Sequence, residues 1–502
     1  MSTLLTREEY ENIARNLALP NEAFIDGAFR PAISGKTFRT TNPATGAVLT
    51  EIAACAAEDV DLAVASARTA FDDGRWSRLR PGERKEVLLR LCELMARDAT
   101  ELAVMESLDS GKTIFDCTTI DVPETIHCLR WHAELIDKIY DQVAPASDNH
   151  IAMVVREPVG VVGLVLPWNF PLLMLAWKIG PALAAGCSVV LKPAAETSLT
   201  ALRVAQLAHE AGVPAGVLNV VPGSGSAVGE PLGRHPDVDM VSFTGSTVTG
   251  RRFLHYSADS NLKEVVLEMG GKNPCVVMDD AEELDVVAAH VVNGAFWNMG
   301  ENCSAASRLI VHKDIKDALL EKVMTLAAEW KVGDPLDPTV RVGALVSKAH
   351  FDKVCTYLAA TKQGEILMGG RAIDGVFVEP TIVDVGSNDS LLAREEIFGP
   401  VLSVITVSNF DEAIAVANDT EYGLAASLFT ANTKRAIRGA RAIRAGTVTV
   451  NSFGEGDIAT PFGGYKQSGF GGRDNSIHAH DQYTQLKTIW LDLNVASDAG
   501  KN

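Results

Sequence analysis

The segment FWNMGENCSAASRLIV contains the residue best suited to nucleophilic chemistry, Cys303. Small or polar residues surround the thiol and predict a turn, and the RLIV that follows predicts a strand. A lone cysteine is more often a buried structural residue, and the other cysteines of the chain stand in apolar or helical stretches. A turn, however, can present a thiol to a cleft. Because a thiol is appreciably ionised near neutral pH and attacks carbonyl carbon, Cys303 is a candidate nucleophile.

Two polar residues follow predicted buried strands. Glu268 comes after VVL and before two glycines, and at the carboxyl edge of a parallel sheet its desolvation would raise its pKa toward that of a general base. The alternative is an ordinary surface glutamate at a strand end. Asn169 lies in PWNFP (167–171). It is either a helix cap or a rigid amide donor for an oxyanion.

Glycine-rich turns offer places for a phosphate. FTGSTVTG (243–250) places Gly245 and Gly250 at a strand-to-helix turn, and GSGSAVG (223–229) contains Gly225 in a similar turn. Such turns put backbone N–H groups at a helix N-terminus, where an anion binds. Each is weak evidence alone, because glycine turns are frequent in every α/β protein.

The elements that position these residues alternate regularly from residue 160. Short apolar runs separated by helices, such as the one predicted at 199–212, indicate a parallel sheet covered on both faces. The first set of predicted strands is GVVGLVLP (160–167), SVVLKP (188–193), VLNVVPG (217–223), DMVSFTG (239–245) and EVVLEMGG (264–271). A second set predicts another α/β unit and comprises NPCVVM, SRLIVH, ILMGG, FVEPTIV, LSVITV and GTVTVN.

The flanking segments differ from this pattern. Residues from about 55 to 140 have helical periodicity, with a helix end predicted at Gly111, and residues 149–167 favour strands. QLKTIWLDLNV near the C-terminus alternates as an isolated strand would, and such a strand often pairs with another segment or subunit. The N-terminal residues predict a helix that begins with a capping box of Thr6 and Glu9, and not a signal peptide.

Composition limits the class of protein and its partners. A length of 502 residues predicts two or three domains. The net charge of −19 would repel the phosphates of a nucleic acid. Eight cysteines without a C-x-x-C pair predict neither disulfides nor a metal site, and they favour the reducing cytoplasm. The apolar stretch 160–177 is interrupted by two prolines and an asparagine, which argues against a membrane span.

The motifs together resemble the aldehyde dehydrogenase superfamily from about residue 20 to 495. Their number and order make a chance match negligible. They are LDSGK (108–112), REPVGVV (156–162), PWNFP (167–171), KIGPALAAG (178–186), FTGST (243–247), LEMGGKNP (267–274), GENC (300–303), EEIFGPV (395–401), NDTEYGLAA (418–426) and PFGGYKQSG (461–469). Further stretches resemble bacterial aminoaldehyde dehydrogenases of the γ-glutamyl-γ-aminobutyraldehyde type, at 130–145, 454–469 and 484–493.

The resemblance implies catalytic roles for four residues. Cys303 corresponds to the nucleophile and Glu268 to the base that activates the deacylating water. Asn169, with the backbone N–H of Cys303, corresponds to the oxyanion hole, and Lys178 to a positioning lysine. The implied reaction oxidises an aldehyde to a carboxylate. The thiolate adds to the aldehyde, hydride passes to a nicotinamide, and water hydrolyses the thioester.

The implied coenzyme is NAD, with NADP possible, and Lys192 and Glu396 would hold its two riboses. The related subgroup usually has a glutamate three residues after this lysine. Here that position is Ala195, with Glu196 one place later, so we expect measurable use of NADP. The other candidate coenzyme contacts are Leu166, Trp168, Gly225, Gly245, Ser246, Gly250 and Phe398.

The fold implied by the resemblance is two doubly wound α/β domains with a small β element for self-association as a homodimer or homotetramer. The coenzyme-binding domain would comprise residues 1–139 and 160–270, the catalytic domain 271–470, and the oligomerisation element 140–159 and 471–502. The loop SGFGGRD (468–474) is one residue longer than the usual pattern, which would change a subunit contact or the rim of the site.

Two features bear on the substrate. An aromatic tunnel to Cys303 is predicted, with core packing as the alternative for at least one of its residues, and the candidates are Phe170, Trp177, Phe296 and Trp297. The loop 454–461 carries Glu455 and Asp457, and a carboxylate beside aromatic faces can hold an ammonium. Asp457 is the expected contact, although a solvated loop is an equal alternative. An aminoaldehyde is therefore the first expectation, and phenyl- or indole-acetaldehyde the second.

Two other classes of function remain open. A cysteine hydrolase would use the thiol without a coenzyme, but no histidine lies in a motif near Cys303. A non-catalytic relative would be expected to lack the thiol, which is present. Glu268 argues against an acylating enzyme that uses coenzyme A, since such enzymes generally lack this base. An assay of nicotinamide absorbance with a generic aldehyde separates these alternatives.

Overall fold

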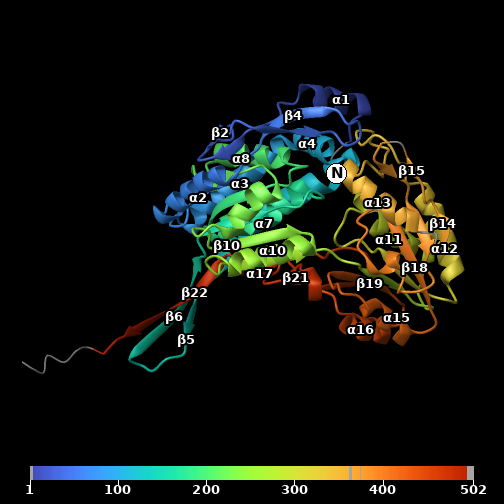
Figure 1. Cartoon of the computed structure of the whole chain (residues 1–502). Helices are drawn as coiled ribbons and strands as arrows, with labels where there is room; N and C mark the ends of the chain where they lie inside the picture. Colours follow the sequence, from blue (N-terminus) through green and yellow to red (C-terminus); the bar gives the residue numbers. More distant parts are fainter. Residues whose placement is uncertain (1–3, 361–363, 374, 495–502) are drawn as a thin grey trace, which may run out of the picture.

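The computed structural model describes residues 4–360, 364–373 and 375–494. Figure 1 shows two α/β bodies side by side and a narrow arm of strands that projects from the first body. The first body is built mainly from residues before 270 and the second from residues after it. None of the described helices has the length and apolar character needed to cross a membrane.

The sheet of the first body has the strand order β2-β1-β9-β8-β7-β10-β11-β21. Its five central strands are parallel, as predicted. Two short antiparallel strands at its N-terminal edge, and the hairpin of β3 and β4, lie in residues 23–53, where no strand was predicted. The strands are β1 (Ala23–Ile25), β2 (Ala28–Arg30), β3 (Thr37–Thr41), β4 (Val48–Ala53), β7 (Val161–Val165), β8 (Ser188–Lys192), β9 (Leu218–Val220), β10 (Met240–Gly245), β11 (Glu264–Met269) and β21 (Gly469–Phe470).

The helices of the first body cover both faces of this sheet. Successive residues of a strand point to opposite faces, so Val189 and Leu191 enter one core and Val190 the other. Gly111 ends α4 in the left-handed conformation (φ 81°) and Thr6 and Glu9 form the capping box of α1, both as predicted. The helices are α1 (Arg7–Asn16), α2 (Ala57–Asp72), α3 (Pro81–Arg97), α4 (Ala99–Ser110), α5 (Ile114–Asp116), the π-helical turn η1 (Cys117–Asp121), α6 (Val122–Leu135), η2 (Ile136–Lys138), α7 (Pro171–Ala185), α8 (Leu199–Ala211), η3 (Gly225–Gly229), α9 (Glu230–Arg234), α10 (Thr247–Ala258) and α17 (Ser476–Asp481).

The second body contains a sheet with the order β14-β17-β18-β13-β12-β19-β20. Sequence patterns missed β19, because its alanine-rich AASLF has a low strand propensity. Burial between β12 and β20 outweighs that propensity. The strands are β12 (Pro274–Val277), β13 (Arg308–His312), β14 (Glu365–Met368), β17 (Thr381–Asp384), β18 (Val401–Val407), β19 (Ala425–Phe429) and β20 (Thr447–Val450), with β15 (Ala372–Ile373) and β16 (Phe377–Val378) as a separate pair.

Helices flank this second sheet on both faces, which gives it two cores as well. Both bodies are therefore doubly wound, as the fold prediction required. The helices are α11 (Leu284–Phe296), η4 (Trp297–Gly300), α12 (Lys316–Ala328), α13 (Lys348–Ala360), α14 (Leu391–Arg394), α15 (Phe410–Asn418), α16 (Thr433–Ala442) and η6 (Lys466–Ser468).

The projecting arm consists of β5 (Gln142–Ala144), β6 (His150–Pro158) and β22 (Thr484–Asp492) in the order β22-β6-β5. The C-terminal strand thus pairs with another segment, as its alternation predicted. Large apolar side chains are exposed along the arm, including Val143 (75%), Leu486 (69%) and Trp490 (59%). Strand β21, which lies within the predicted catalytic domain 271–470, pairs with β11 of the first sheet, and the predicted domain boundaries stay a prediction. Residues 495–502 of the predicted oligomerisation element lie outside the described residues.

Candidate active site

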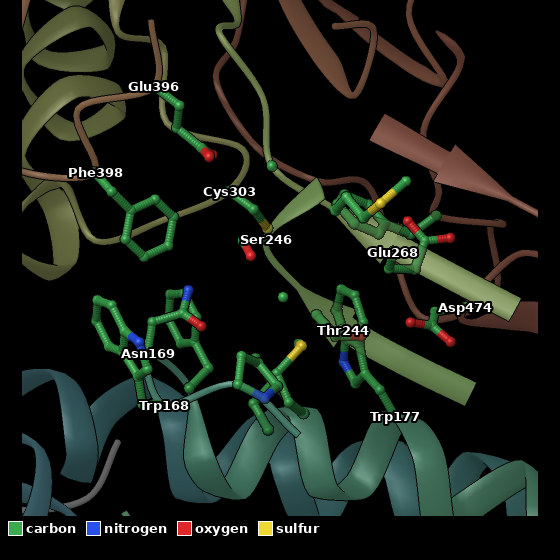
Figure 2. A pocket seen from close by; sticks show the side chains of 18 of the residues that line it. Trp168, Asn169, Trp177, Thr244, Ser246, Glu268, Cys303, Glu396, Phe398 and Asp474 are labelled. Carbon is green, nitrogen blue, oxygen red and sulfur yellow. The ribbon is translucent and has the colours of Figure 1, made fainter. Parts of the chain in front are cut away.

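A cavity of about 260 Å³ opens at the carboxyl ends of β10 and β11, where the first turn of α7 and the turn after η4 meet. Figure 2 shows Trp168, Glu396 and Phe398 toward one end of the cavity, and Glu268, Trp177 and Asp474 toward the other. Cys303 lies between these two groups. Ligands bind at this edge of open α/β sheets, so the geometry agrees with the position expected for Glu268.

Cys303 is half-buried in a turn, as predicted, and lines the cavity. Two residues just before it, Asn298 and Met299, have positive φ angles (53° and 57°), which fold the chain tightly after α11. Burial raises the pKa of the thiol well above its usual value, and nearby glutamates raise it further. This shift runs against the expectation that the thiol is appreciably ionised near neutral pH, because burial disfavours the thiolate.

Asn169 is buried (6% exposed) at the start of α7. Its side-chain Nδ2 donates a hydrogen bond to the carbonyl of Glu301 (3.0 Å), in the loop that leads to Cys303. Phe170 stands at the N-cap position of α7, so Asn169 is not the helix cap. An amide nitrogen carries two protons, and the second remains available toward the cavity that Asn169 lines.

Glu268 is the penultimate residue of β11 and is buried (3% exposed) at the cavity wall. Burial and the nearby Asp474 raise its pKa well above the usual value, while Lys178 and Arg473 oppose them. This is the desolvation predicted from the sequence. Gly463 of the PFGG motif packs against it: a Cβ there would lie 2.6 Å from Glu268 Oε1. A larger residue at 463 would displace the carboxylate.

A buried ion pair supports Glu268. Lys178, on α7, is fully buried, and its Nζ donates to Asp474 Oδ2 (2.8 Å). Asp474 also lines the cavity and is almost fully buried. Sequence reasoning identified Lys178 but missed Asp474, which ends the loop SGFGGRD. The unusual length of that loop pointed to the rim of the site, yet no pattern singled out its aspartate.

The other end of the cavity suits a dinucleotide. Trp168 and Phe398 meet edge to face, with ring centroids 5.3 Å apart, and Glu396 Oε1 accepts a hydrogen bond from the Gly271 N–H (2.8 Å). Ser246 lines the same end and begins α10 as its N-cap. A Cβ at Gly270 would lie 2.1 Å from Glu396 Oε2, so glycine is required for this approach. An aromatic wall, a carboxylate and a helix N-terminus fit a planar ring, a ribose diol and a phosphate.

Of the remaining coenzyme candidates, Gly245 lines the cavity, whereas Lys192 and the others are not among its lining residues. Lys192 is buried (5% exposed), and its Nζ donates to the carbonyl of Pro193 (2.7 Å). Burial lowers its pKa to about 8, opposed by the charge of the exposed Glu196. Gly250 is buried where α10 packs on β11. A Cβ at this position would lie 2.6 Å from Met269 Sδ, so the close packing favours glycine. Gly225 is exposed in η3, Gly245 is half-buried at the end of β10, and Leu166 is buried after β7. The coenzyme roles of these three residues and of Gly250 stay predictions.

Aromatic side chains line the cavity as expected, with one correction. Phe170 packs beside Trp297 (centroids 5.2 Å apart), and Trp177 packs against Phe462 (5.1 Å). Phe296 is instead fully buried in a core of the second body. The prediction that Phe296 lines the tunnel is therefore wrong. Phe296 is the last residue of α11 and points into the hydrophobic core that α11 covers.

The acidic loop also requires a correction. Glu455 lines the cavity, and its Oε1 accepts a short hydrogen bond from the Ser304 hydroxyl (2.5 Å). Asp457 is exposed and accepts a hydrogen bond from the Ala459 N–H within its own loop (2.8 Å). The prediction that Asp457 faces the tunnel is thus wrong. The loop turns at Gly456 (φ 94°), which directs the two carboxylates differently.

One histidine of the cavity was missed because it is remote in sequence from Cys303. His350, on α13, packs against Trp168 (centroids 5.0 Å apart), and its Nε2 lies 2.6 Å from the carbonyl of Phe398. Burial lowers its pKa to about 4. Since its ring is committed to Phe398, His350 is not arranged as the base of a cysteine hydrolase. Lys353 of the same helix lines the cavity as well.

Comparisons with known proteins show which family the chain resembles over nearly its whole length. The family model described as the aldehyde dehydrogenase family matches residues 29–489. The chain is 68% identical to aminoacetaldehyde dehydrogenase of Pseudomonas aeruginosa, over 98% of this chain and 100% of that protein. The structure of gamma-glutamyl-gamma-aminobutyraldehyde dehydrogenase from Burkholderia cenocepacia is 51% identical with a TM-score of 0.96, and the match covers 98% of this chain and 100% of that one. A mutant of P. syringae AldA indole-3-acetaldehyde dehydrogenase, in complex with NAD+ and IAA, is 49% identical with a TM-score of 0.96, over 97% and 100% of the chains.

Proposed function

The chain belongs to the aldehyde dehydrogenase family and oxidises an aldehyde to a carboxylic acid with NAD or NADP, and we propose that Cys303, Asn169 and Glu268 carry the reaction. The observation that supports these roles is their convergence on one cavity from three different elements (Figure 2). The activity is tested by nicotinamide absorbance with a generic aldehyde, and the roles by the variants described below and in the Discussion.

The first step is addition of the Cys303 sulfur to the aldehyde carbon. Because the pKa of the thiol is raised, the proton must leave as the sulfur attacks, and Glu268, whose own pKa is raised, is suited to accept it. The free N–H of Asn169 and the backbone N–H of Cys303 hold the oxyanion that forms. One such donor is typically worth about 10²–10³ in rate.

The second step releases the acid. After hydride departure the acyl group is a thioester on Cys303, and Glu268, having lost its first proton to solvent, removes a proton from water. The hydroxide attacks the thioester carbon and the sulfur leaves as thiolate. We propose that the buried ion pair of Lys178 and Asp474 holds this end of the cavity in position. Asp474 adds to the effect of burial in raising the pKa of Glu268, and Lys178 opposes it.

The residues present fit a nicotinamide dinucleotide. Glu396 and Lys192 would hold its riboses, Ser246 a phosphate, and Trp168 and Phe398 the ring end of the molecule. When bound, the oxidised coenzyme supplies the hydride acceptor and a positive charge that lowers the pKa of the Cys303 thiol. The first body, residues 1–139 and 160–270, would then be the coenzyme-binding domain, and residues 271–470 the catalytic domain.

Coenzyme preference gives a prediction at Glu196. We expect NAD to be preferred and NADP to be used measurably, because Ala195 carries no carboxylate and Glu196 is the neighbouring carboxylate that can repel a 2′-phosphate. Glu196→Gln should raise kcat/KM for NADP relative to NAD roughly 2- to 5-fold, since charges about 8 Å apart in water interact by ~0.5 kcal/mol per charge pair. Glu365→Gln, at an exposed glutamate on β14, is the matched control. An unchanged NADP/NAD ratio in the Glu196 variant would exclude this role.

The substrate we propose is an ω-aminoaldehyde whose ammonium binds Glu455. The names of the relatives include an aminoacetaldehyde and a γ-glutamyl-γ-aminobutyraldehyde dehydrogenase. In this chain Glu455 brings a carboxylate into a cavity walled by Phe170, Trp177 and Trp297. Burial raises the pKa of Glu455, and an ammonium would restore its charge. Cation–π attraction to the rings adds roughly 0.5–2 kcal/mol.

This proposal predicts a selective loss of affinity in Glu455→Gln. A hydrogen bond to a charged group is worth about 1.5–3 kcal/mol, so KM for 4-aminobutyraldehyde or 4-guanidinobutyraldehyde should rise ~10-fold or more. KM for a neutral aldehyde of similar length should change little. Asp457→Asn removes a neighbouring carboxylate of the same loop that is exposed, and it should leave both values unchanged. Equal changes for cationic and neutral substrates would show that Glu455 does not bind the cation.

Aromatic aldehydes are the second candidate substrates. The wall formed by Phe170, Trp177, Trp297 and Phe462 favours flat apolar groups, and one structural relative carries the name indole-3-acetaldehyde dehydrogenase. If Glu455→Gln lowers KM for indole-acetaldehyde while leaving the cationic substrates unaffected, this candidate gains over the first.

The assembly we propose is a homodimer or homotetramer formed through the arm. Its exposed apolar residues, such as Leu486 and Trp490, and the free edge of β22 are unusual on a surface in water. We also place the enzyme in the cytoplasm, because all eight cysteines are unpaired thiols.

A further inference from the structure

A fully buried lysine lies directly beneath the segment that carries Asn169. Lys112, two residues after the end of α4, is 1% exposed. Its Nζ donates to the backbone carbonyl of Asn169 (3.2 Å) and lies 3.8 Å from the ring centroid of Phe170. A charged donor thus contacts both Asn169, the proposed oxyanion donor, and Phe170, part of the aromatic wall.

The charge of Lys112 is balanced from the opposite side. Asp121 is fully buried, and its Oδ2 lies 2.9 Å from Lys112 Nζ. Asp121 is the last residue of the π-helical turn η1, a local widening of the helix that is frequent at functional sites. Burial works against the lysine's charge, but Asp121 and Glu106 outweigh it and raise the pKa of Lys112. The cation is therefore maintained inside the protein.

Further contacts hold the same segment. Glu106 accepts a hydrogen bond from the Leu172 N–H (3.1 Å), at the first turn of α7. Asn298 Nδ2 donates to the Asn169 carbonyl (3.0 Å) and to the Glu301 carbonyl (2.9 Å). The Asn169 amide itself donates to that Glu301 carbonyl. The backbone carbonyl of Asn169 therefore accepts hydrogen bonds from two donors, Asn298 and the charged Lys112.

We propose that Lys112, paired with Asp121, is a positioning residue that fixes the Asn169 amide where the oxyanion of the substrate forms. Burying an ion pair is costly and gains little stability over apolar packing, so its place under Asn169 points to a role in orientation. Loss of the hydrogen bond from Lys112 would displace Asn169, and misplacement of a catalytic group by about 1 Å can lower the rate ~10²-fold. This inference rests on the proposed oxyanion role of Asn169.

The test is a double-mutant cycle between Lys112→Met and Asn169→Ala, with hydride transfer followed in single turnovers. We expect Lys112→Met to slow transfer about 10²-fold in the parent and to have nearly no further effect in Asn169→Ala, because it acts through that amide. Coenzyme affinity, measured by fluorescence, should stay unchanged. Lys263→Met, at a buried lysine that bonds the Gly233 carbonyl away from the cavity, is the matched control and should retain parental transfer.

Lys112→Met leaves Asp121 buried without its partner, so Lys112→Met/Asp121→Leu provides a second variant without charges. It should be folded and as slow as Lys112→Met. Equal slowing by Lys112→Met in both Asn169 backgrounds, or parental transfer in the uncharged double variant, would overturn the proposal. If Asn169→Ala alone transfers hydride at the parental rate, the oxyanion role fails first and this inference fails with it.

Discussion

Cys303→Ala is expected to lower aldehyde oxidation by at least ~10⁴-fold, the scale seen when a covalent nucleophile is removed. The reason is that Cys303 is the one cysteine that lines the cavity shared by Asn169 and Glu268, within the described residues. The variant should still bind NAD, because Glu396, Trp168 and Phe398 form one end of the cavity and the thiol is not part of that group. Steady-state turnover and coenzyme affinity of the purified variant measure the two expectations.

Cys355→Ala is the control for this experiment. Cys355 is also half-buried, but it lies on α13 and packs against a core of the second body. Its removal should leave turnover at the parental level. More than trace turnover in Cys303→Ala, from a preparation free of the parent enzyme, would mean that the reaction does not pass through a thioester on this residue.

The arrangement of the sheets could be predicted because the strands of both bodies are short, apolar and separated by amphipathic helices. Prediction failed for strands that are short or whose residues have a low strand propensity. AASLF became β19 only through its neighbours β12 and β20, and the short strands before residue 53 form through contacts that no local pattern encodes. Local propensity therefore described the interior of each sheet better than its edges.

The site was predictable to the extent that its residues stand in recognisable motifs. Cys303, Glu268 and Asn169 do, and the structure brings them to one cavity. Asp474 and His350 enter the same cavity from loops and helices that are remote in sequence, and only the folded chain reveals their proximity. The loop at 454–461 shows the limit most clearly. Its composition predicted a carboxylate in the tunnel, but the turn at Gly456 decides that it is Glu455 and not Asp457.

The ionisation of the thiol could not be predicted from residue type. A free cysteine is partly ionised near neutral pH, whereas desolvation raises the pKa of the half-buried Cys303, and Glu455, Glu396 and Glu268 raise it further. The same burial raises the pKa of Glu268. Burial therefore disfavours the charged form of both the thiol and the carboxyl group. A cationic ring or tail bound beside these groups would favour their charged forms, which would couple the chemistry to the presence of ligand.

Glu268→Gln is expected to separate the two halves of the reaction. The amide cannot take a proton from water, so the thioester should form and then persist. A stopped-flow trace should show a burst of reduced coenzyme close to one per site, followed by a steady state slower by about 10²–10⁴-fold, the usual contribution of a general base. In the parent, the steady-state rate should rise with pH through the raised pKa of Glu268, because its deprotonated form is the one that acts.

The rate of the burst distinguishes the two duties proposed for Glu268. If it also accepts the thiol proton, the burst in Glu268→Gln should be slower than in the parent and should recover as the pH rises, since hydroxide then ionises Cys303 directly. A burst of parental rate would assign Glu268 to deacylation alone, and another group would take the thiol proton. Steady turnover equal to that of the parent would remove Glu268 from the mechanism. The conservative Glu264→Gln, at the exposed start of the same strand β11, should leave both phases unchanged, because its carboxylate lies at the end of the strand away from the cavity.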